Sequence, residues 1–157
     1  MTTTARDVMQ TEVLALNESD SLIEAHQFFV RHDITGAPVI NDDGRLVGVV
    51  SIRDLLRTED EDHDVSRTVA DYFCESSGYA SLSGDLDHLR EGLSEIPISE
   101  VMTRDTICVA PDSPIKEVAA LIRKHRIHRV LVASPGTEER LEIAGIISLF
   151  DLVSLLE

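Results

Sequence analysis

The chain of 157 residues has about the length of one ordinary domain, and its 29 acidic against 14 basic side chains give a formal charge of −15. Such a charge repels polyanions over most of the surface, so we expect no nucleic-acid partner. No apolar run approaches the roughly 18 residues that span a bilayer, and residues 1–4 lack the pattern of a signal peptide. We therefore expect a cytoplasmic protein without a membrane partner.

The first third of the chain predicts the order strand, helix, strand, strand, helix. A short apolar run at 13–16 predicts the first strand, and Asp20 is a candidate N-cap for a helix with an apolar stripe. The stripe consists of Leu22, Ala25 and Phe29. Two more apolar runs are joined by a loop with an Asp-Gly pair, which is typical of a hairpin, and a helix follows. These three elements are expected at 36–40, 46–50 and 52–57.

The middle of the chain, residues 58–97, has no counterpart elsewhere in the sequence. It begins with an acidic run at 59–64, which favours a solvated face over a cation site. Apolar residues at helical spacing, including Leu86, Leu89 and Leu93, predict that this insert is partly helical.

The last third repeats the order of the first. Its helix is expected to have Ser113 as the N-cap and Pro114 at the first helical position, with an apolar stripe. The stripe consists of Ile115, Val118 and Ile122. Two strands, at 129–133 and 141–147, and a helix at 149–156 are expected to follow. Cys108 is expected to be a small buried side chain near the first strand.

Residues 5–57 and 98–157 are two copies of one unit. The copies are offset by 93 positions, and by 97 after a loop that is longer in the second copy. The identical pairs are Val8/Val101, Met9/Met102, Glu24/Glu117, His32/His125, Ile34/Ile127, Val39/Val132, Gly48/Gly145, Ser51/Ser148 and Asp54/Asp151. We therefore expect an α/β (α+β) fold of two pseudo-symmetric β-α-β-β-α units that share a core, because a unit of this size alone is marginal.

Four motifs of the two copies resemble the cystathionine-β-synthase (CBS) domain, which usually occurs in pairs. They are the Val-Met openings, the segments 34–39 and 127–132, and the Gly-x-x-Ser-x-x-Asp endings at 48–54 and 145–151. The resemblance implies two units packed sheet to sheet, with two clefts that often bind adenosine-containing ligands. It also implies a homodimer with a regulatory, non-enzymatic role, and no catalytic cofactor.

Asp54 and Asp151 are the first candidate ligand-binding residues. One interpretation is an N-terminal capping box with Ser51 or Ser148, which needs no ligand. The other is that the carboxylate accepts hydrogen bonds from both hydroxyls of a ribose, as the family resemblance implies, while the serine faces phosphate. The two roles are compatible.

His128 and Arg129 follow the only concentrated group of cations, 123–126, in this acidic chain. Cations are favourable at the C-terminus of a helix, which accounts for the positive charges at 123–126. His128 and Arg129 lie beyond that end, at the entry to the next strand, so phosphate contact is the favoured role for this pair. The first copy has Thr35 and Gly36 at the matching positions, which add no charge, so the two sites cannot be equivalent.

Gly36, Ala37 and Pro38 form the last candidate segment. Proline on a strand is typical of an edge or a strand start, which would leave backbone groups open near an adenine ring. A tight turn into an edge strand without a ligand explains the segment equally well. No catalytic constellation and no metal spacing is found, so neither an enzyme nor a metal site is expected.

The leading hypothesis is a regulatory CBS-pair protein that binds AMP, ADP, ATP or S-adenosylmethionine between its repeats and signals occupancy to an effector protein. Residues 58–97 are the favoured surface for that effector. The alternative is a ligand-free scaffold for dimerisation or protein contact, whose clefts are vestigial.

Overall fold

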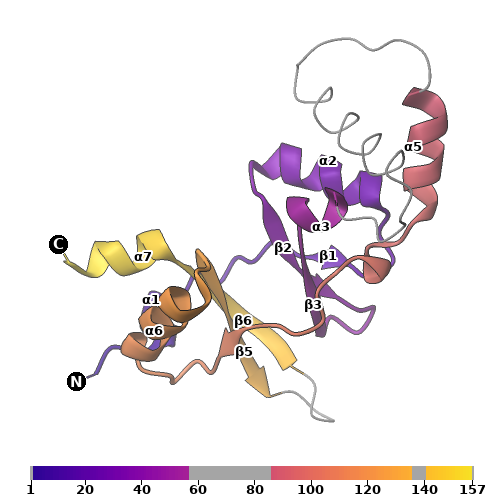
Figure 1. The fold of residues 1–157 in the computed structure, drawn as a ribbon. Helices are drawn as coiled ribbons and strands as arrows, with labels where there is room; N and C mark the ends of the chain where they lie inside the picture. The colour runs from indigo at the N-terminus through magenta and orange to yellow at the C-terminus, as the bar shows by residue number, and fades with distance from the viewer. Residues whose placement is uncertain (1, 57–85, 136–140, 157) are drawn as a thin grey trace. The chain divides into compact units, whose positions relative to one another are not determined.

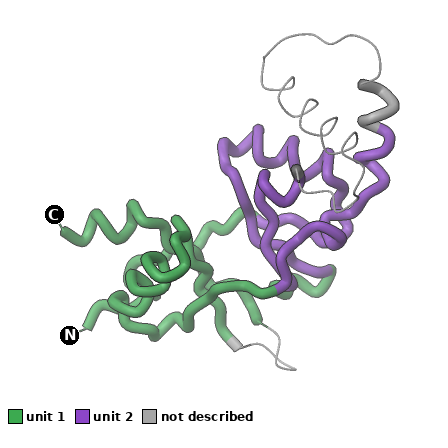
Figure 2. The backbone as a smooth tube through the Cα atoms, viewed as in Figure 1, with its two compact units in different colours: residues 1–14, 42–46, 105–157 green, residues 15–41, 47–104 purple. Residues whose placement is uncertain are grey.

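The computed structural model describes residues 2–56, 86–135 and 141–156, which form a mixed α+β structure (Figure 1). The chain divides into two compact units, distinguished by colour in Figure 2. Unit 1 comprises residues 1–14, 42–46 and 105–157, and unit 2 comprises residues 15–41 and 47–104. Each contains one three-stranded sheet, so the expected fold class is confirmed.

Unit 2 is built on a sheet in which β2 is the central strand, between β1 and β3. Its elements are β1 (Leu16–Asn17), α2 (Leu22–His32), β2 (Gly36–Ile40), β3 (Leu46–Ser51), α3 (Ile52–Leu56), α5 (Leu86–Glu95) and the 3-10 helix η1 (Ile98–Glu100). The predicted stripe of α2 is confirmed, because Leu22, Ala25 and Phe29 are all buried in the core of this unit.

Unit 1 repeats the arrangement, with β5 between β4 and β6. Its elements are α1 (Ala5–Val8), β4 (Cys108–Val109), α6 (Ile115–His125), β5 (Arg129–Pro135), β6 (Leu141–Ser148), α7 (Leu149–Val153) and the 3-10 helix η3 (Ser154–Leu156). Val118 and Ile122 of the predicted α6 stripe are buried, whereas Ile115 is partly buried at its margin.

The opening segment of each repeat belongs to the compact unit of the other repeat. Residues 1–14 lie in unit 1, where Gln10 pairs with Ile146 of β6. Residues 98–104 lie in unit 2, where Thr103 pairs with Val49 of β3 in the same way. The compact units are thus a different division of the chain from the sequence repeats.

The first strand and the two helix starts differ from the sequence prediction. β1 begins only at Leu16, because its parallel pairing with β2 starts at the Leu16–Val39 pair. The N-cap of α2 is Ser21 rather than Asp20: Ser21 Oγ accepts from Glu24 N–H at 3.2 Å, and Glu24 Oε2 accepts from Ser21 N–H at 2.8 Å. Asp20 instead closes the preceding turn, where its Oδ2 accepts from Asn17 N–H at 2.8 Å.

The start of α6 is likewise one residue later than expected. Pro114, which was expected at the first helical position, is the N-cap, and the helix begins at Ile115. Pro114 has an extended ψ of 139°, so the residue expected to begin the helix lies outside it. Cys108 is only partly buried, because it lies in a two-residue strand at the side of its sheet.

The two predicted hairpin strands of the first repeat and one helix of the insert are confirmed. β2 spans Gly36–Ile40 as expected, and Gly44 in the loop after it has a φ of +77°, a conformation that favours glycine. α5 contains Leu93, which is buried against the core of unit 2. The rest of the insert up to residue 85 lies outside the described residues.

Candidate ligand-binding site

Each repeat ends in a serine–aspartate capping box at the junction of a strand and a short helix. In unit 2, Asp54 Oδ2 accepts from Ser51 N–H at 2.7 Å and from Ser51 Oγ at 2.9 Å, while Asp54 N–H donates to Ser51 Oγ at 3.3 Å. The capping interpretation of the sequence motif is therefore confirmed for α3. The box occupies Oδ2 and leaves Oδ1 of Asp54 without a hydrogen bond from the described residues.

The box in unit 1 has nearly the same geometry. Asp151 Oδ2 accepts from Ser148 N–H at 2.7 Å and from Ser148 Oγ at 2.6 Å, and Asp151 N–H donates to Ser148 Oγ at 3.3 Å. Ser148 is the N-cap of α7, and both side chains of the box are partly exposed. Both boxes thus present a carboxylate that accepts two hydrogen bonds from its serine, while a third bond, from the aspartate N–H to the serine Oγ, completes the box.

The backbone at the start of the central strand lies beside each box. Ile52 N–H donates to Thr35 O at 2.9 Å in unit 2, and Leu149 N–H donates to His128 O at 2.9 Å in unit 1. The structure therefore brings four predicted site residues together in each unit. They are Thr35, Gly36, Ser51 and Asp54 in unit 2, and His128, Arg129, Ser148 and Asp151 in unit 1.

Gly36 lies against the serine of its box. A methyl group on Gly36 would lie 3.2 Å from Val50 O and 3.6 Å from the Ser51 α-carbon. In unit 1 the matching residue is Arg129, which is the cross-strand partner of Ser148. One site therefore has a residue without a side chain at the position where the other has an arginine.

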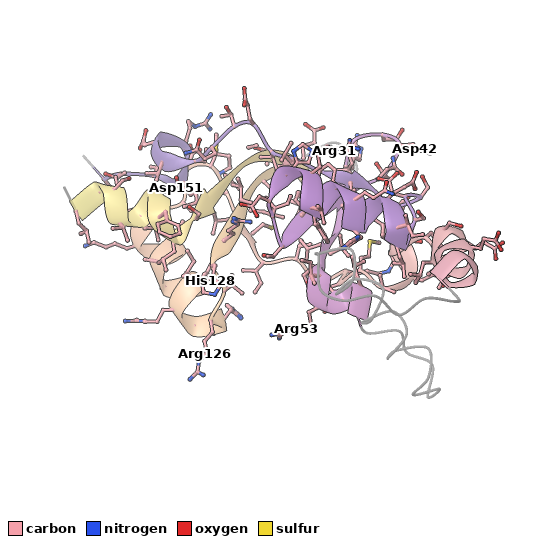
Figure 3. The ribbon with its side chains drawn as sticks, turned by 90° about the horizontal axis from the view of Figure 1, so that it is seen from above. Arg31, Asp42, Arg53, Arg126, His128 and Asp151 are labelled. Atoms are coloured by element: carbon pink, nitrogen blue, oxygen red, sulfur yellow. The ribbon has the colours of Figure 1, made fainter. Side chains whose placement is uncertain are left out.

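The two cationic candidates, His128 and Arg129, are exposed at the start of β5. Neither forms an ion pair with the residues that the structure describes, so both are available to an anion. Arg126 in the preceding turn has a left-handed φ of 53°, and Figure 3 shows its side chain extending outward from the turn.

Ala37 and Pro38 have buried side chains on β2. Of the two positions expected for this proline, the edge strand is wrong, because β2 is the central strand of its sheet, whereas Pro38 does lie near the start of β2. Proline is tolerated there because pairing with β1 begins only at Val39, one residue later, so its missing N–H removes no bond from that ladder. These two residues can offer a ligand only backbone atoms.

Gln10 is a site residue that the motif search did not identify. Its Nε2 donates to Asp151 Oδ1 at 3.0 Å, so both carboxylate oxygens of Asp151 accept hydrogen bonds. The side chain is held in reach by the backbone, because Gln10 N–H donates to Ile146 O at 2.9 Å and Ile146 N–H donates to Gln10 O at 3.0 Å. The only feature of the sequence that could have identified Gln10 is that Thr103, at the matching position of the second repeat, has a different side chain.

Asp151 is more acidic than an ordinary aspartate. Partial burial acts to raise the pKa of its carboxyl group, but hydrogen bonds from the side chain and backbone of Ser148 and from Gln10 act in the opposite direction. The positive charge of Arg129 adds to them, so the pKa lies below its usual value. Asp151 is therefore a carboxylate at neutral pH, which is the form that accepts hydrogen bonds from hydroxyl groups.

Neither a metal-binding cluster nor a membrane-spanning helix is present in the residues that the structure describes. Within residues 2–56, 86–135 and 141–156, no three His, Cys, Asp or Glu side chains are grouped to hold a metal ion. Across those same ranges, every helix is too short or too polar to cross a bilayer. The acidic run at 59–64 lies outside the described residues.

The chain is similar in sequence and in structure to several known proteins. The chain is 29% identical over 156 residues to the uncharacterized protein MJ1426 of Methanocaldococcus jannaschii, covering 96% of this chain and 89% of that protein. It spans only 42% of the length of another relative, MJ1225 of the same organism. The CBS domain of a CBS domain-containing membrane protein from Sphaerobacter thermophilus has a similar structure, with a TM-score of 0.67 and 26% identity, covering 99% of this chain and 89% of that one.

Two further solved structures share the fold and contain ligands. A CBS domain pair of protein MJ0100 was solved with 5′-methylthioadenosine and S-adenosyl-L-methionine, at a TM-score of 0.64 and 21% identity over 99% of this chain and 97% of that one. CBSX2 was solved with AMP, at a TM-score of 0.65 and 22% identity over 98% of this chain and 95% of that one. The family model of the CBS domain matches residues 5–61 and 98–157. With two such matches over most of its length, the chain belongs to the CBS domain family.

Proposed function

We propose that this protein is a regulatory module that binds an adenosine-containing ligand through its two serine–aspartate boxes. AMP, ADP, ATP and S-adenosylmethionine are the candidate ligands. The module would report occupancy to an effector protein, and we include a homodimer in the proposal. No catalytic step is part of this function.

The observation that carries the proposal is the fixed carboxylate of each box. The capping bonds to Ser51 hold Asp54 Oδ2 in place, and Oδ1 accepts no hydrogen bond from the described residues. A ribose presents two adjacent hydroxyl donors, and an ionised carboxylate is an acceptor with several lone pairs and two oxygens. Because the box already orients the carboxylate, binding would cost little side-chain ordering.

The charges beside the boxes support a difference between the two sites. Exposed His128 and Arg129 adjoin the Ser148–Asp151 box, whereas Thr35 and Gly36 adjoin the Ser51–Asp54 box. An arginine side chain can bind a phosphate through two parallel hydrogen bonds. We therefore propose that a phosphate group is bound near His128 and Arg129, and that the Thr35 side favours an uncharged part of a ligand.

Ligands seen in proteins of the same fold agree with this class. MJ0100 and CBSX2 were solved with 5′-methylthioadenosine, S-adenosyl-L-methionine or AMP, which share an adenosine moiety. A signal to a partner would arise if the ligand binds one conformation more tightly than another and so shifts their populations.

Thermal unfolding with AMP, ADP, ATP and S-adenosylmethionine tests the proposal. A ligand at about 100 times its dissociation constant adds about 2.7 kcal/mol to the free energy of unfolding, which raises the melting temperature measurably. The double variant Asp54→Ala with Asp151→Ala is the matched control and should lose the shift. Equal shifts in the wild type and the double variant would remove the boxes from the site.

A ligand-free interaction scaffold is the second candidate function. It is favoured by apolar side chains that are exposed on α7 and η3, of which Phe150 is 85% exposed and Leu156 is 86% exposed. Exposed apolar side chains that lie together are typical of protein contact surfaces. No melting shift with any of the four ligands, together with a stable dimer in sedimentation, would favour this function.

A further inference from the structure

The two boxes differ in the hydrogen bonding of one atom, the Oδ1 oxygen of the aspartate. In unit 1, Gln10 donates a hydrogen bond to Asp151 Oδ1 at 3.0 Å. In unit 2, the residue at the matching position is Thr103, and Asp54 Oδ1 accepts nothing from the described residues. The other hydrogen bonds of the two boxes agree within 0.3 Å, since the serine Oγ distances are 2.9 Å and 2.6 Å. The contrast therefore belongs to Gln10 rather than to the boxes.

The backbone places Gln10 and Thr103 at equivalent positions. Gln10 exchanges two backbone hydrogen bonds with Ile146, at 2.9 Å and 3.0 Å. Thr103 exchanges two with Val49, both at 2.9 Å. Ile146 precedes Ser148 by two residues, and Val49 precedes Ser51 by two, so both opening segments lie at the same distance along the strand from their box. Threonine is shorter than glutamine and has no side-chain amide to donate.

We propose that Gln10 is a specificity-determining residue that makes the two boxes unequal, by competing with a ligand hydroxyl for Asp151 Oδ1. This inference rests on the proposed binding of adenosine ligands. Asp54 is then the box that offers an open oxygen to a ribose, whereas at Asp151 a ribose hydroxyl competes with the Gln10 amide for Oδ1. Gln10 thus makes Asp151 the weaker acceptor of a ligand hydroxyl, whereas His128 and Arg129 beside it act on a phosphate.

The energetic argument is a simple exchange. A ligand at Asp54 replaces water at Oδ1, whereas a ligand at Asp151 meets an amide donor that already occupies part of Oδ1 and is held in place by its backbone. A net intramolecular hydrogen bond changes an equilibrium constant by about three- to tenfold. The exposure of Gln10 places the expected effect toward the lower end of that range.

The experiment measures AMP binding by calorimetry in backgrounds that isolate one box. In the Asp54→Ala protein the remaining binding reports on Asp151, and adding Gln10→Thr or Gln10→Ala should tighten it by about three- to tenfold. In the Asp151→Ala protein the remaining binding reports on Asp54, and adding Thr103→Gln should weaken it by a similar factor. Circular dichroism and melting of each variant verify that it is folded.

A second measurement needs no ligand. The pKa of the Asp151 carboxyl group, followed by carbon-detected nuclear magnetic resonance, should rise in Gln10→Thr because a stabilising hydrogen bond to the ionised form is lost. An unchanged pKa would show that the bond does not form in solution, and the inference would fail at its first step.

The possible failures are distinguishable. If neither the wild type nor any variant binds AMP or S-adenosylmethionine, the proposed function is wrong and this inference falls with it. If AMP binds and the Asp54→Ala and Asp151→Ala changes weaken it, but Gln10→Thr leaves the affinity unchanged, only this inference is wrong. Weaker binding in Gln10→Thr would assign Gln10 a direct contact with the ligand and overturn the competition.

Discussion

The sulfur of Met9 lies against the face of Gly145 where other residues carry a side chain. A methyl group on Gly145 would lie 2.7 Å from Met9 Sδ and 2.8 Å from Gln10 O. The second repeat has the same relationship with the roles exchanged, since a methyl group on Gly48 would lie 2.8 Å from Met102 Sδ and 2.9 Å from Thr103 O. The Val-Met openings and the glycines of the Gly-x-x-Ser-x-x-Asp endings are therefore parts of one contact.

Gly145→Ala should lower the free energy of unfolding by about 1–3 kcal/mol, because the added methyl group meets both a side chain and a backbone oxygen. Urea denaturation followed by circular dichroism measures the change. Gly92→Ala in α5 is the matched control: nothing lies within 4 Å of the added carbon, and the variant should gain about 0.5–1 kcal/mol from reduced backbone entropy. Equal stability of the two variants would show that the Met9 contact is loose.

Asp54→Ala should weaken adenosine-ligand binding and also cost about 1 kcal/mol of stability through the loss of the capping box. Asp7→Ala is a control for the second effect alone, because Asp7 Oδ2 accepts from Thr4 N–H and Thr4 Oγ1, both at 2.8 Å, in a box outside the candidate sites. Calorimetric titration with AMP separates the two contributions. A loss of affinity in Asp7→Ala equal to that in Asp54→Ala would attribute the effect to stability.

Arg126→Gly should raise the free energy of unfolding by up to about 1 kcal/mol, because Arg126 has a φ of 53° after the end of α6 and glycine adopts this conformation without strain. Arg126→Ala is the control, since it removes the same charge but keeps the β-carbon and should give no gain. Thermal melting of both variants at low and high salt measures the difference. A gain in Arg126→Ala equal to that in Arg126→Gly would identify charge repulsion as the cause.

The contribution of Asp151 to stability should vanish in acid. Its pKa in the folded protein lies below the ordinary value of 3.8, so the stabilisation is complete above that value and is lost as the pH falls through the lower pKa of the folded state. The difference in unfolding free energy between the wild type and Asp151→Ala should therefore be constant from pH 7 to about pH 5 and shrink toward pH 2. A difference that persists at pH 2 would assign the effect of the substitution to packing.

The elements that could be predicted from the sequence are those set by local patterns. β2 and the apolar stripe of α2 were predicted correctly, because strand alternation, helical spacing and the Asp-Gly turn act over a few residues. The N-cap of α2 was misplaced by one residue since Asp20 and Ser21 both have capping side chains. Their roles are divided by the bond from Asn17 N–H to Asp20, which no single-residue preference shows.

The relationships that escaped the sequence analysis are those between distant positions. Gln10 and Asp151 are separated by 141 positions, and no periodic pattern connects them. The capping boxes were predicted from the spacing of serine and aspartate, but the donor to the second carboxylate oxygen depends on which segment pairs with β6. The exchange of opening segments between the repeats determines that pairing, and it leaves no local signature in the sequence.

This exchange also affects the order in which the protein can fold during its synthesis. Both segments of unit 2 lie between residues 15 and 104, so they leave the ribosome before β6 of unit 1 is synthesised. Unit 1 needs residues 1–14 together with β6, so this early segment must wait until Ile146, the pairing partner of Gln10, has been synthesised. Until then Met9 lacks its contact with Gly145, and a nascent chain stalled before residue 141 would expose the Met9 side chain to chaperones.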